Sequence, residues 1–518
     1  MTQNLQIDQK NICTVNSSEM WRKLPWKTLS KETSRLQKRI YKASRNNLLL
    51  SQKQGGLAKT LDLQKLLLHS YSARMIAIRQ VTQLNEGKKT AGIDGKLALT
   101  NAERFMLEKK LHQQVKQWQH QDLRKVPIPK SNGKIRILKI PTIADRAWQC
   151  LVKLALEPAH EAEFHERSYG FRPGRSTHDA QKFLFHHLKS TSNGKDKRVI
   201  ELDIEKCFDR INHQTILDKA IAPKWVKDRL RQCLNAGIHP DYPEQGTPQG
   251  GVISPLLANI ALNGIESIHT SVRYADDMVF ILKPQDDAEQ IQKQVELFLS
   301  ERGMNISQKK TRVTATQTGF DFLGWHCKVH DNGKFMSTPS KENYKKVKKK
   351  IKEVANHSTY GADVKSKLLG PIVRGWRNYH KHCDMRKHNL WHITHRTWKK
   401  FTNQPSMNRY KANNLIEQAF PKISYSVNRF INVKGNKSPF DGDLIYWAKR
   451  NSKYYDGITG KVLKKANYRC DYCNHYLHNE EKIEWHHVDG NHQNWQTKNL
   501  QVLHQSCHDI VHHSKMNE

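Results

Sequence analysis

The sequence has no stretch that would anchor the chain in a membrane. Its longest run without a charged residue, 245–265, contains glutamine and asparagine and is broken by prolines and glycines, so we predict no membrane-spanning helix. The first ten residues include Asp8 and lack an apolar core, which predicts no secretory signal. Internal repeats and low-complexity tracts are also missing. These absences disfavour membrane and secreted proteins.

Acidic residues are scarce relative to basic ones. The 518 residues include 49 Asp+Glu against 87 Lys+Arg, a formal net charge of +38. Such a surplus indicates a polyanion partner, because each neutralised nucleic-acid phosphate releases condensed counterions. A basic ribosome-associated protein, or a merely soluble one, is the alternative. With 37% apolar residues the chain can form several packed cores, so wholesale disorder is not expected.

The cysteines do not suggest a disulfide framework. There are nine, an odd number, scattered along most of the chain and clustered only near its end. This distribution favours a reducing compartment and a metal site.

Hydrophobic periodicity divides the chain into regions with different predicted secondary structure. From about Trp21 to Glu86 apolar residues recur at three- and four-residue spacing, which predicts helices. From Val126 to about Trp325 short apolar runs alternate with Gly, Pro and helical patterns, as in α/β domains. Residues 403–414 are predicted to be a linker, and 424–455 a small basic module.

Three aspartates follow or interrupt predicted strands. The run 199–204 alternates, so Asp203 points away from the apolar face, and Asp276 and Asp277 lie at the turn of a predicted hairpin. Adjacent carboxylates repel unless cations neutralise them, and two Mg²⁺ ions would do so in phosphoryl transfer. An exposed acidic turn is the alternative for a lone Asp-Asp pair.

Six blocks in this region resemble, in order, those of reverse transcriptases. They are the fingers block at 128–142, the block at 168–176, the first aspartate motif at 203–209, the nucleotide-pocket motif at 246–260, the Tyr-Ala-Asp-Asp motif at 274–277 and the block at 319–325. One departure is Ile137-Leu138-Lys139, where the family often has Pro-Leu-Gly.

The resemblance implies a role for each matched residue. Two Mg²⁺ ions would be held by Asp203, Asp276 and Asp277. The incoming dNTP would be contacted by Lys134, Arg136 and Gln249, with Phe208 under the sugar to exclude a 2′-hydroxyl. A lysine and an arginine both suit phosphate, the first as a point charge and the second as a rigid fork.

A basic region follows the polymerase blocks. Helically spaced apolar residues in 344–354 are separated by lysines, which is often only a solvated helix face. Arg374, Trp376 and Arg377 then interleave cations and an aromatic ring, a pattern suited to phosphate contact and base stacking. Residues 369–379 resemble the maturase region of group II intron proteins, which implies a helical thumb and an intron RNA partner.

The C-terminal tail holds two pairs with the spacing that tetrahedral zinc favours. Cys470 and Cys473 form the first pair, and His504 and Cys507 the second. Together they would make a structural Zn²⁺ site, and in so small a segment metal binding would supply much of the folding energy.

The residues between and after these pairs resemble the HNH nuclease motif. The resemblance implies that His487 is the general base, that Asn499 orients it, and that His486, His508 and His512 bind one Mg²⁺ or Mn²⁺. A neutral histidine is suited to taking a proton near pH 7. A zinc ribbon that only binds DNA is the alternative.

Together these patterns predict a multidomain α/β protein with right-hand fingers and palm, an α-helical thumb/maturase domain and a small zinc-containing ββα-metal (HNH) domain. The expected boundaries are an N-terminal extension at 1–88, fingers and palm at 89–330, thumb/maturase at 331–405, a linker and basic DNA-binding region at 406–460, and the endonuclease at 461–518.

The expected function is that of a group II intron-encoded protein. It would copy RNA into DNA, bind its intron RNA and assist splicing, and nick duplex target DNA so that the new 3′ end primes cDNA synthesis. A splicing-only maturase with relic enzymatic domains, and a reverse transcriptase that serves host defence, are the alternatives. We expect a bacterial, cytoplasmic or nucleoid-associated protein; the sequence does not predict its oligomeric state.

Overall fold

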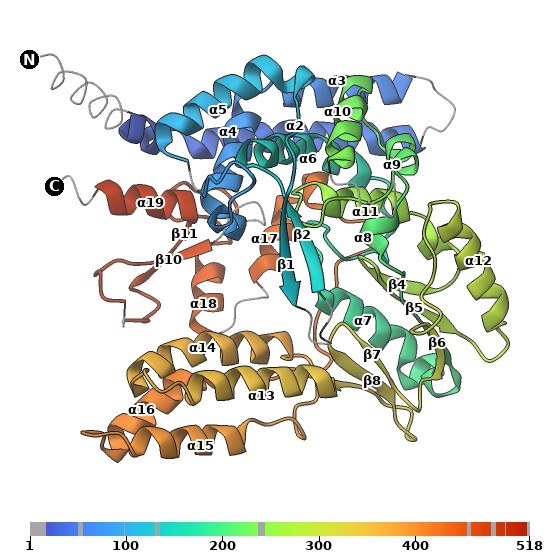
Figure 1. Cartoon of the computed structure of the whole chain (residues 1–518). Helices are drawn as coiled ribbons and strands as arrows, with labels where there is room; N and C mark the ends of the chain where they lie inside the picture. Colours follow the sequence, from blue (N-terminus) through green and yellow to red (C-terminus); the bar gives the residue numbers. More distant parts are fainter. Residues whose placement is uncertain are drawn as a thin grey trace, which may run out of the picture.

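The computed structural model describes residues 17–49, 55–97, 99–129, 133, 135–236, 244–452, 457–477, 483–492 and 494–514. Lys134, one of the predicted nucleotide contacts, lies outside these residues. Figure 1 shows helices from the N-terminal part above a central sheet region, a group of helices below it and a small module at the side. Among the described residues, no helix is both long and apolar enough to span a bilayer.

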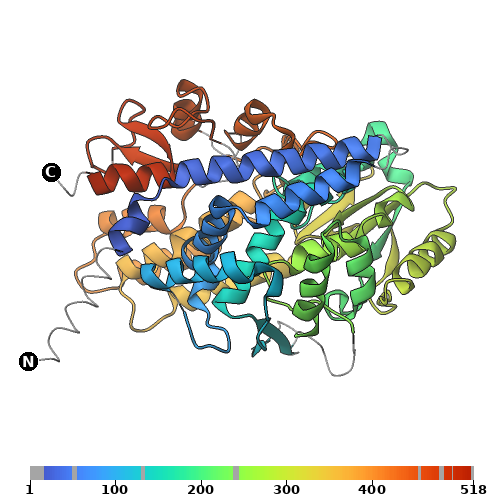
Figure 2. The same ribbon diagram turned by 90° about the horizontal axis from the view of Figure 1, so that it is seen from above.

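The predicted N-terminal helices are present and pack around a buried one. They are α2 (Trp26–Leu49), α3 (Gly55–Leu68), α4 (Tyr71–Arg79) and α5 (Asn101–Gln114), and the helix they cover is α6 (Ile143–Glu161). Leu67, Leu68 and Met75, which the helical spacing placed on one face, are fully buried. Figure 2 shows α2 running along one side of the molecule beside the C-terminal part of the chain.

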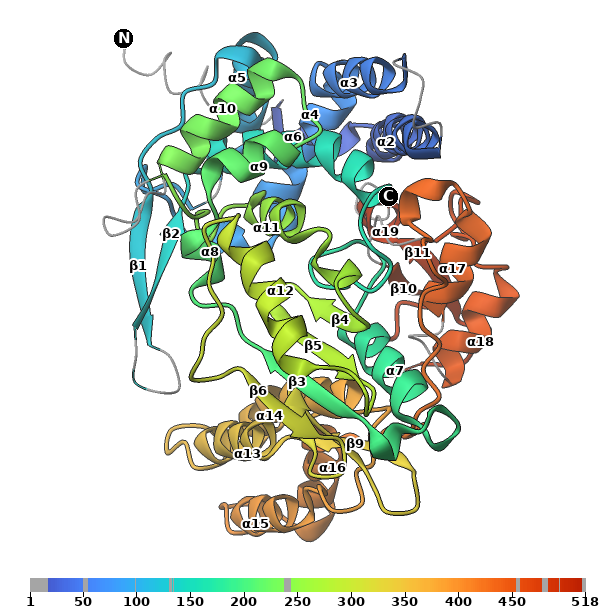
Figure 3. The same cartoon turned by 90° about the vertical axis from the view of Figure 1, so that its right-hand side faces the viewer.

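The palm is a four-stranded antiparallel sheet of order β4-β5-β3-β6. Its strands are β3 (Arg198–Leu202), β4 (Ser271–Tyr274), β5 (Asp277–Leu282) and β6 (Arg312–Ala315). Helices cover both faces, which is why β5 is apolar at successive positions. Phe280 faces the cluster that contains α12 (Ala288–Ser300), and Val279 and Ile281 face the cluster that contains α7 (Thr177–Leu188). Figure 3 shows α12 lying across this sheet.

Smaller elements complete the fingers and palm. The fingers hairpin pairs β1 (Arg124–Pro129) with β2 (Ile135–Ile140), and a second sheet joins β7 (Phe320–Phe322), β8 (Trp325–Val329) and β9 (Phe335–Pro339). The remaining helices are α8 (Cys207–Arg210), α9 (His213–Lys219), α10 (Lys224–Asn235) and α11 (Ser254–Leu262).

Four helices form the thumb. They are α13 (Lys341–Ala355), α14 (Ala362–Tyr379), α15 (Trp391–Thr402) and α16 (Arg409–Ala419). The prediction of a linker over 403–414 is wrong from residue 409 onward, because Asn408 caps α16 and Ala412 and Ala419 are buried against the other thumb helices. Helical packing therefore continues to Phe420, beyond the expected boundary at 405.

Residues 431–450, called here the return segment, lie back on the palm. The Arg450 guanidinium binds both carboxylate oxygens of Asp179 on α7, at 2.7 and 2.9 Å, and both side chains are buried. The Trp447 ring is fully buried and donates to the carbonyl of Ser438 at 3.0 Å. The segment ends within helix α17 (Leu444–Ser452), which continues two residues further. It is thus part of the folded polymerase body.

Residues 457–514, called here the C-terminal module, have a ββα core. After α18 (Gly457–Lys465), β10 (Ile483–His487) pairs antiparallel with β11 (Leu500–His504), and α19 (Gln505–Ser514) follows directly. A small cluster of apolar residues that includes Val462, Leu463 and Val502 fills its interior.

Candidate active sites

The palm sheet brings the three predicted aspartates to one edge. Leu202 is paired with Met278, so Asp203 and Asp277 continue the ladder side by side, and Ala275 makes the turn before them at φ +60°. Partial burial and the charges of Asp276 and Asp203 raise the pKa of Asp277 to about 6. Burial and Asp203 also raise the pKa of Asp276. Carboxylates that repel one another in this way form a donor set that fits hard cations such as Mg²⁺.

A lysine that the sequence analysis did not single out neutralises part of this charge. The Lys310 ammonium lies 3.0 and 2.9 Å from the two carboxylate oxygens of Asp203. Lysines are frequent in this chain, and 107 residues separate the partners, so no local pattern points to Lys310.

Buried ionic contacts fix the aspartate turn. The Arg273 guanidinium, on β4, is fully buried and binds the Glu266 carboxylate, the Asn259 side-chain oxygen at 2.9 Å and the Ala275 carbonyl at 3.1 Å. The Asn259 amide in turn donates to the Gly170 carbonyl at 2.8 Å. A Cβ atom at Gly170 would lie 2.2 Å from the Ala275 nitrogen, so a side chain there would displace the aspartate turn.

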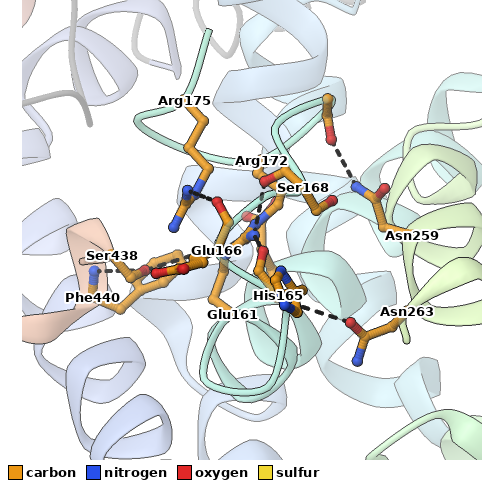
Figure 4. Close-up of polar contacts among 12 residues, drawn as sticks. Glu161, His165, Glu166, Ser168, Arg172, Arg175, Asn259, Asn263, Ser438 and Phe440 are labelled. Atoms are coloured by element: carbon orange, nitrogen blue, oxygen red, sulfur yellow. Dashed lines mark hydrogen bonds and ion pairs between the residues drawn. The ribbon is translucent and has the colours of Figure 1, made fainter. Parts of the chain in front are cut away.

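A second buried pair supports the loop that contains Gly170. Arg172 forms a fork with both carboxylate oxygens of Glu161 at 2.8 and 3.0 Å and also donates to the carbonyls of His165 and Ser168 (Figure 4). Two parallel hydrogen bonds fix the orientation of both groups. The block at 168–176 therefore supports the aspartate turn from the side of Gly170.

Two of the predicted nucleotide-pocket residues, Arg136 and Gln249, are in direct contact. The Arg136 guanidinium donates to the side-chain oxygen of Gln249. Burial raises the pKa of Asp276, and the positive charge of Arg136 opposes that rise. The Gln249 amide is 3.4 Å from the Asp209 carboxylate. Phe208 is half-buried, its ring edge-on to Phe171 at 6.3 Å between centroids.

The Ile-Leu-Lys departure falls at a backbone contact. The Lys139 amide donates to the Gln249 carbonyl at 2.9 Å, and a Cβ at Gly250 would lie 2.8 Å from the Lys139 carbonyl oxygen. Main-chain atoms make these contacts, so they tolerate a different side chain at residue 139.

The three predicted RNA contacts on α14 differ in their surroundings. Arg374 is exposed. The Trp376 indole donates to the Asn343 side chain at 2.8 Å, and Arg377 donates to the carbonyls of Phe420 and Pro421 at 3.1 and 2.6 Å. Burial lowers the pKa of Arg377. Trp376 and Arg377 hold the thumb together, and RNA contact remains a prediction for all three.

The four predicted zinc ligands converge. One ligand atom from each of Cys470, Cys473, His504 and Cys507 lies within 4.8 Å of the others. The His504 Nδ1 is 3.3 Å from the Cys473 sulfur, while its Nε2 lies 3.3 Å from the Tyr476 carbonyl. A proton on Nε2 leaves Nδ1 as the metal-facing lone pair, the second-shell arrangement usual for ligating histidines. Hydrogen bonds from Cys470 and Cys507 lower the pKa of the Cys473 thiol.

A second group of three histidines lies on the other side of the same helix. Ligand atoms of His486, His508 and His512 also fall within 4.8 Å of one another, and the Nε2 atoms of His508 and His512 are 3.1 Å apart. Residues 508 and 512 are one turn apart on α19, and His486 faces them from β10. The two nitrogens are within hydrogen-bond distance of each other, and burial and the charge of His512 lower the pKa of His508.

His487 and Asn499 occupy neighbouring positions. His487 is buried, and neither ring nitrogen has a hydrogen-bond partner among the described residues. Asn499 donates to the Asp489 carboxylate and the Asn494 carbonyl, each at 2.9 Å, and accepts from the Asp489 amide at 3.1 Å. It thereby closes the loop that follows His487.

Comparison with known protein families agrees with the polymerase and thumb geometry. A reverse transcriptase (RNA-dependent DNA polymerase) model matches residues 128–327. The N-terminal domain of reverse transcriptase matches 21–111, and the group II intron maturase-specific domain matches 344–419. The fold and the palm site thus define a reverse transcriptase with a maturase domain. The matched regions end before the C-terminal module.

Individual proteins with similar sequences show to which family of reverse transcriptases the chain is related. The chain is 35% identical to maturase-like protein 1 of Euglena gracilis over 371 residues, which cover 71% of this chain and 81% of the relative. It is 32% identical to the Euglena longa counterpart over 401 residues, 77% and 86% of the two chains. The group II intron-encoded protein LtrA of Lactococcus lactis subsp. cremoris is 28% identical over 331 residues, which cover 48% of this chain and 54% of LtrA.

This chain belongs to the group II intron reverse transcriptase/maturase family, with RNA-directed DNA polymerase and maturase functions. Its relatives come from algae as well as bacteria, so they give no support for a bacterial origin over a eukaryotic one.

Proposed function

We propose that the chain has two metal-dependent catalytic centres, a polymerase in the palm and a DNA endonuclease in the C-terminal module, and that both serve insertion of a group II intron into DNA. The observation that carries the polymerase centre is the position of Asp203, directly after β3, next to the Asp276–Asp277 turn at the start of the adjacent strand β5. The observation that carries the nuclease is the pair of Cys/His groups on one ββα unit, with buried His487 next to one of them.

In the palm, Asp203, Asp276 and Asp277 would hold two Mg²⁺ ions. These ions would activate the primer 3′-hydroxyl and stabilise the leaving pyrophosphate. Arg136 and Lys134 orient the triphosphate, and Gln249 holds Arg136 in place through the hydrogen bond described above. Phe208 forms the floor under the sugar, so its ring excludes a 2′-hydroxyl by steric contact.

In the C-terminal module, Cys470, Cys473, His504 and Cys507 would hold a structural Zn²⁺ ion. His486, His508 and His512 would hold one Mg²⁺ or Mn²⁺ ion, which would stabilise charge on the scissile phosphate. His487, whose two ring nitrogens have no hydrogen-bond partner among the described residues, accepts the proton of the attacking water. Asn499 fixes the loop that positions it.

The geometry of the two candidate sites also argues against a splicing-only maturase and against a zinc ribbon that only binds DNA. A splicing-only maturase has no need of a supported Asp-Asp turn, whereas Arg273, Asn259 and Gly170 hold this one in place. A zinc ribbon that only binds DNA has no need of a second group of three histidines. Intron RNA, target duplex DNA and dNTPs are accordingly the proposed partners.

A nicking assay tests the endonuclease. Supercoiled plasmid with the cognate insertion site is incubated with the intron ribonucleoprotein and Mg²⁺. We expect the wild type to nick the second strand and His487→Ala to lose at least about a hundredfold in rate, the usual scale for general-base removal. The matched control is His112→Ala, an exposed histidine on α5 outside both groups, which should nick normally. Wild-type nicking by His487→Ala would overturn the assignment.

A further inference from the structure

A large basic groove lies between the N-terminal helix α2 and the C-terminal part of the chain. It has a volume of about 1360 Å³, and three segments line it: α2, the beginning of the return segment, and residues 469–476 of the C-terminal module. Ten lysine and arginine residues contribute to its walls, against a single carboxylate, that of Asp441. Its charge therefore favours an anionic occupant.

The cations on α2 form one continuous stripe. Lys31, Arg35, Lys38 and Lys42 follow one another at three- or four-residue spacing, so they share a helix face, and Arg39 lies beside them. None of these five side chains makes an ion pair with another described residue, whereas Asp441 is already paired with Lys437 at 3.5 Å. A row of like charges along a groove focuses a positive potential there, which attracts a polyanion.

The three walls are joined, so the groove is a fixed feature of the fold. The Lys27 ammonium, on α2, donates to the Cys473 carbonyl at 3.0 Å, in the loop that carries the zinc-type pair. The Tyr41 hydroxyl, also on α2, donates to the Asn436 carbonyl at 3.4 Å. Arg175 extends from the palm side to the Gly435 carbonyl at 3.1 Å (Figure 4 shows Arg175). Figures 2 and 3 agree in placing α2 beside the C-terminal module.

We propose that this groove binds the sugar-phosphate backbone of target DNA and leads it to the C-terminal module. This inference rests on the proposed endonuclease. DNA is favoured because one wall consists of residues 469–476, including Tyr476, whose carbonyl is in contact with the zinc-type ligand His504. A strand in the groove thus lies against the module that would cut it. The cations contact phosphates, which position nucleic acid without reading its sequence.

Salt-dependent binding tests the groove. The variant Arg35→Ala/Lys38→Ala/Arg39→Ala/Lys42→Ala removes four cations from one wall. The matched control, Lys109→Ala/Lys116→Ala/Lys224→Ala/Lys293→Ala, removes four exposed lysines elsewhere. Affinity for a labelled target duplex is measured by anisotropy between 50 and 300 mM salt without divalent cations. Each lost phosphate contact lowers the slope of log affinity against log salt by roughly 0.9, so the loss of four contacts should lower it by roughly 3.6 units.

The expected result is a loss of at least about tenfold in DNA affinity for the groove variant at physiological salt, with normal primer extension as the folding control. The exposed Lys434 on the facing wall provides a second check, because adding Lys434→Ala should weaken DNA binding further. DNA affinity and slope equal to those of the control variant would overturn the proposal. Unchanged DNA affinity with weakened intron RNA binding would show that the occupant is RNA, and would overturn it as well.

A nicking assay on the same variants separates this proposal from the endonuclease itself. If the wild type does not nick, but the groove variant still loses DNA affinity, the endonuclease assignment fails and the groove stands. If the wild type and the groove variant nick with the same rate and the same DNA concentration dependence, the groove fails and the endonuclease stands.

Discussion

The palm and the C-terminal module both gather metal-binding side chains, but they position them differently. In the palm, hydrogen-bonded strands place Asp203 beside Asp277, and the buried Arg273–Glu266 pair fixes the turn between β4 and β5. In the C-terminal module the ligands come from a loop, two strands and a helix around a small apolar cluster. We therefore expect the palm to keep its shape without metal, and we expect the module to need its proposed zinc ion to fold.

The comparison predicts that losing a palm ligand removes activity and leaves the fold intact. Asp276→Asn should reduce cDNA synthesis by at least about a thousandfold, because charge stabilisation by metal ions contributes several kcal/mol to the transition state. Splicing should persist, since it depends on RNA contacts. Primer extension and splicing are measured on the same preparation. The matched control is Asp228→Asn, an exposed aspartate on α10, and normal extension by Asp276→Asn would show that the palm site is misassigned.

Two arginines on α14 are expected to have different roles, one in RNA binding and one in the stability of the thumb. Arg374→Ala should weaken intron RNA binding and lower its salt slope by roughly one unit, because one phosphate contact is lost. Arg377→Ala should instead lower thermal stability, since the carbonyls of Phe420 and Pro421 lose a charged donor. Filter binding and thermal melting are compared for both variants. Equal RNA affinity and slope for Arg374→Ala and the wild type would rule out RNA contact at this residue.

A smaller effect concerns pH. His380 is fully buried where the thumb joins the palm, and burial lowers its pKa to about 3. It stays neutral in the folded chain, while the unfolded chain gains a proton below about pH 6.5. Above pH 6.5 the buried His380 therefore costs no stability. As the pH falls from 6.5 toward 3, protonation of the unfolded chain lowers the free energy of unfolding, by about 1.4 kcal/mol at pH 5.5. Calorimetry at pH 7.5 and 5.5 should show a smaller pH effect in His380→Gln than in the wild type; an identical effect would show that His380 does not contribute.

The candidate residues that the sequence singled out lie close together in the structure, because most of them belong to short, closely spaced motifs. The Asp-Asp pair at 276–277 and the two-residue spacing of Cys470 and Cys473 require no knowledge of the fold. The family comparison confirmed the reverse transcriptase and maturase regions. The ββα order of the C-terminal module was also expected, and the structure has it.

Contacts between distant segments could not be predicted in the same way. Arg450 and Asp179 are 271 residues apart, and it is buried long-range contacts such as this pair that make the return segment part of the polymerase body. Helix α16 was taken for a linker because its two buried alanines, Ala412 and Ala419, give a weak apolar pattern. The side chain of Arg377 turns inward because carbonyls at the end of α16 require a donor, which no local pattern reveals.

Hydrogen exchange before and after zinc removal tests the contrast between the two regions most directly. The full-length protein is first shown by elemental analysis to contain zinc, then treated with a zinc chelator. Exchange is followed in peptides from 457–514 and from the palm strands β3 and β5. We expect the C-terminal module to lose its protection while the palm strands keep theirs, and His504→Ala to reproduce this without chelator. A module that contains no zinc, or keeps its protection when zinc is removed, would contradict the account.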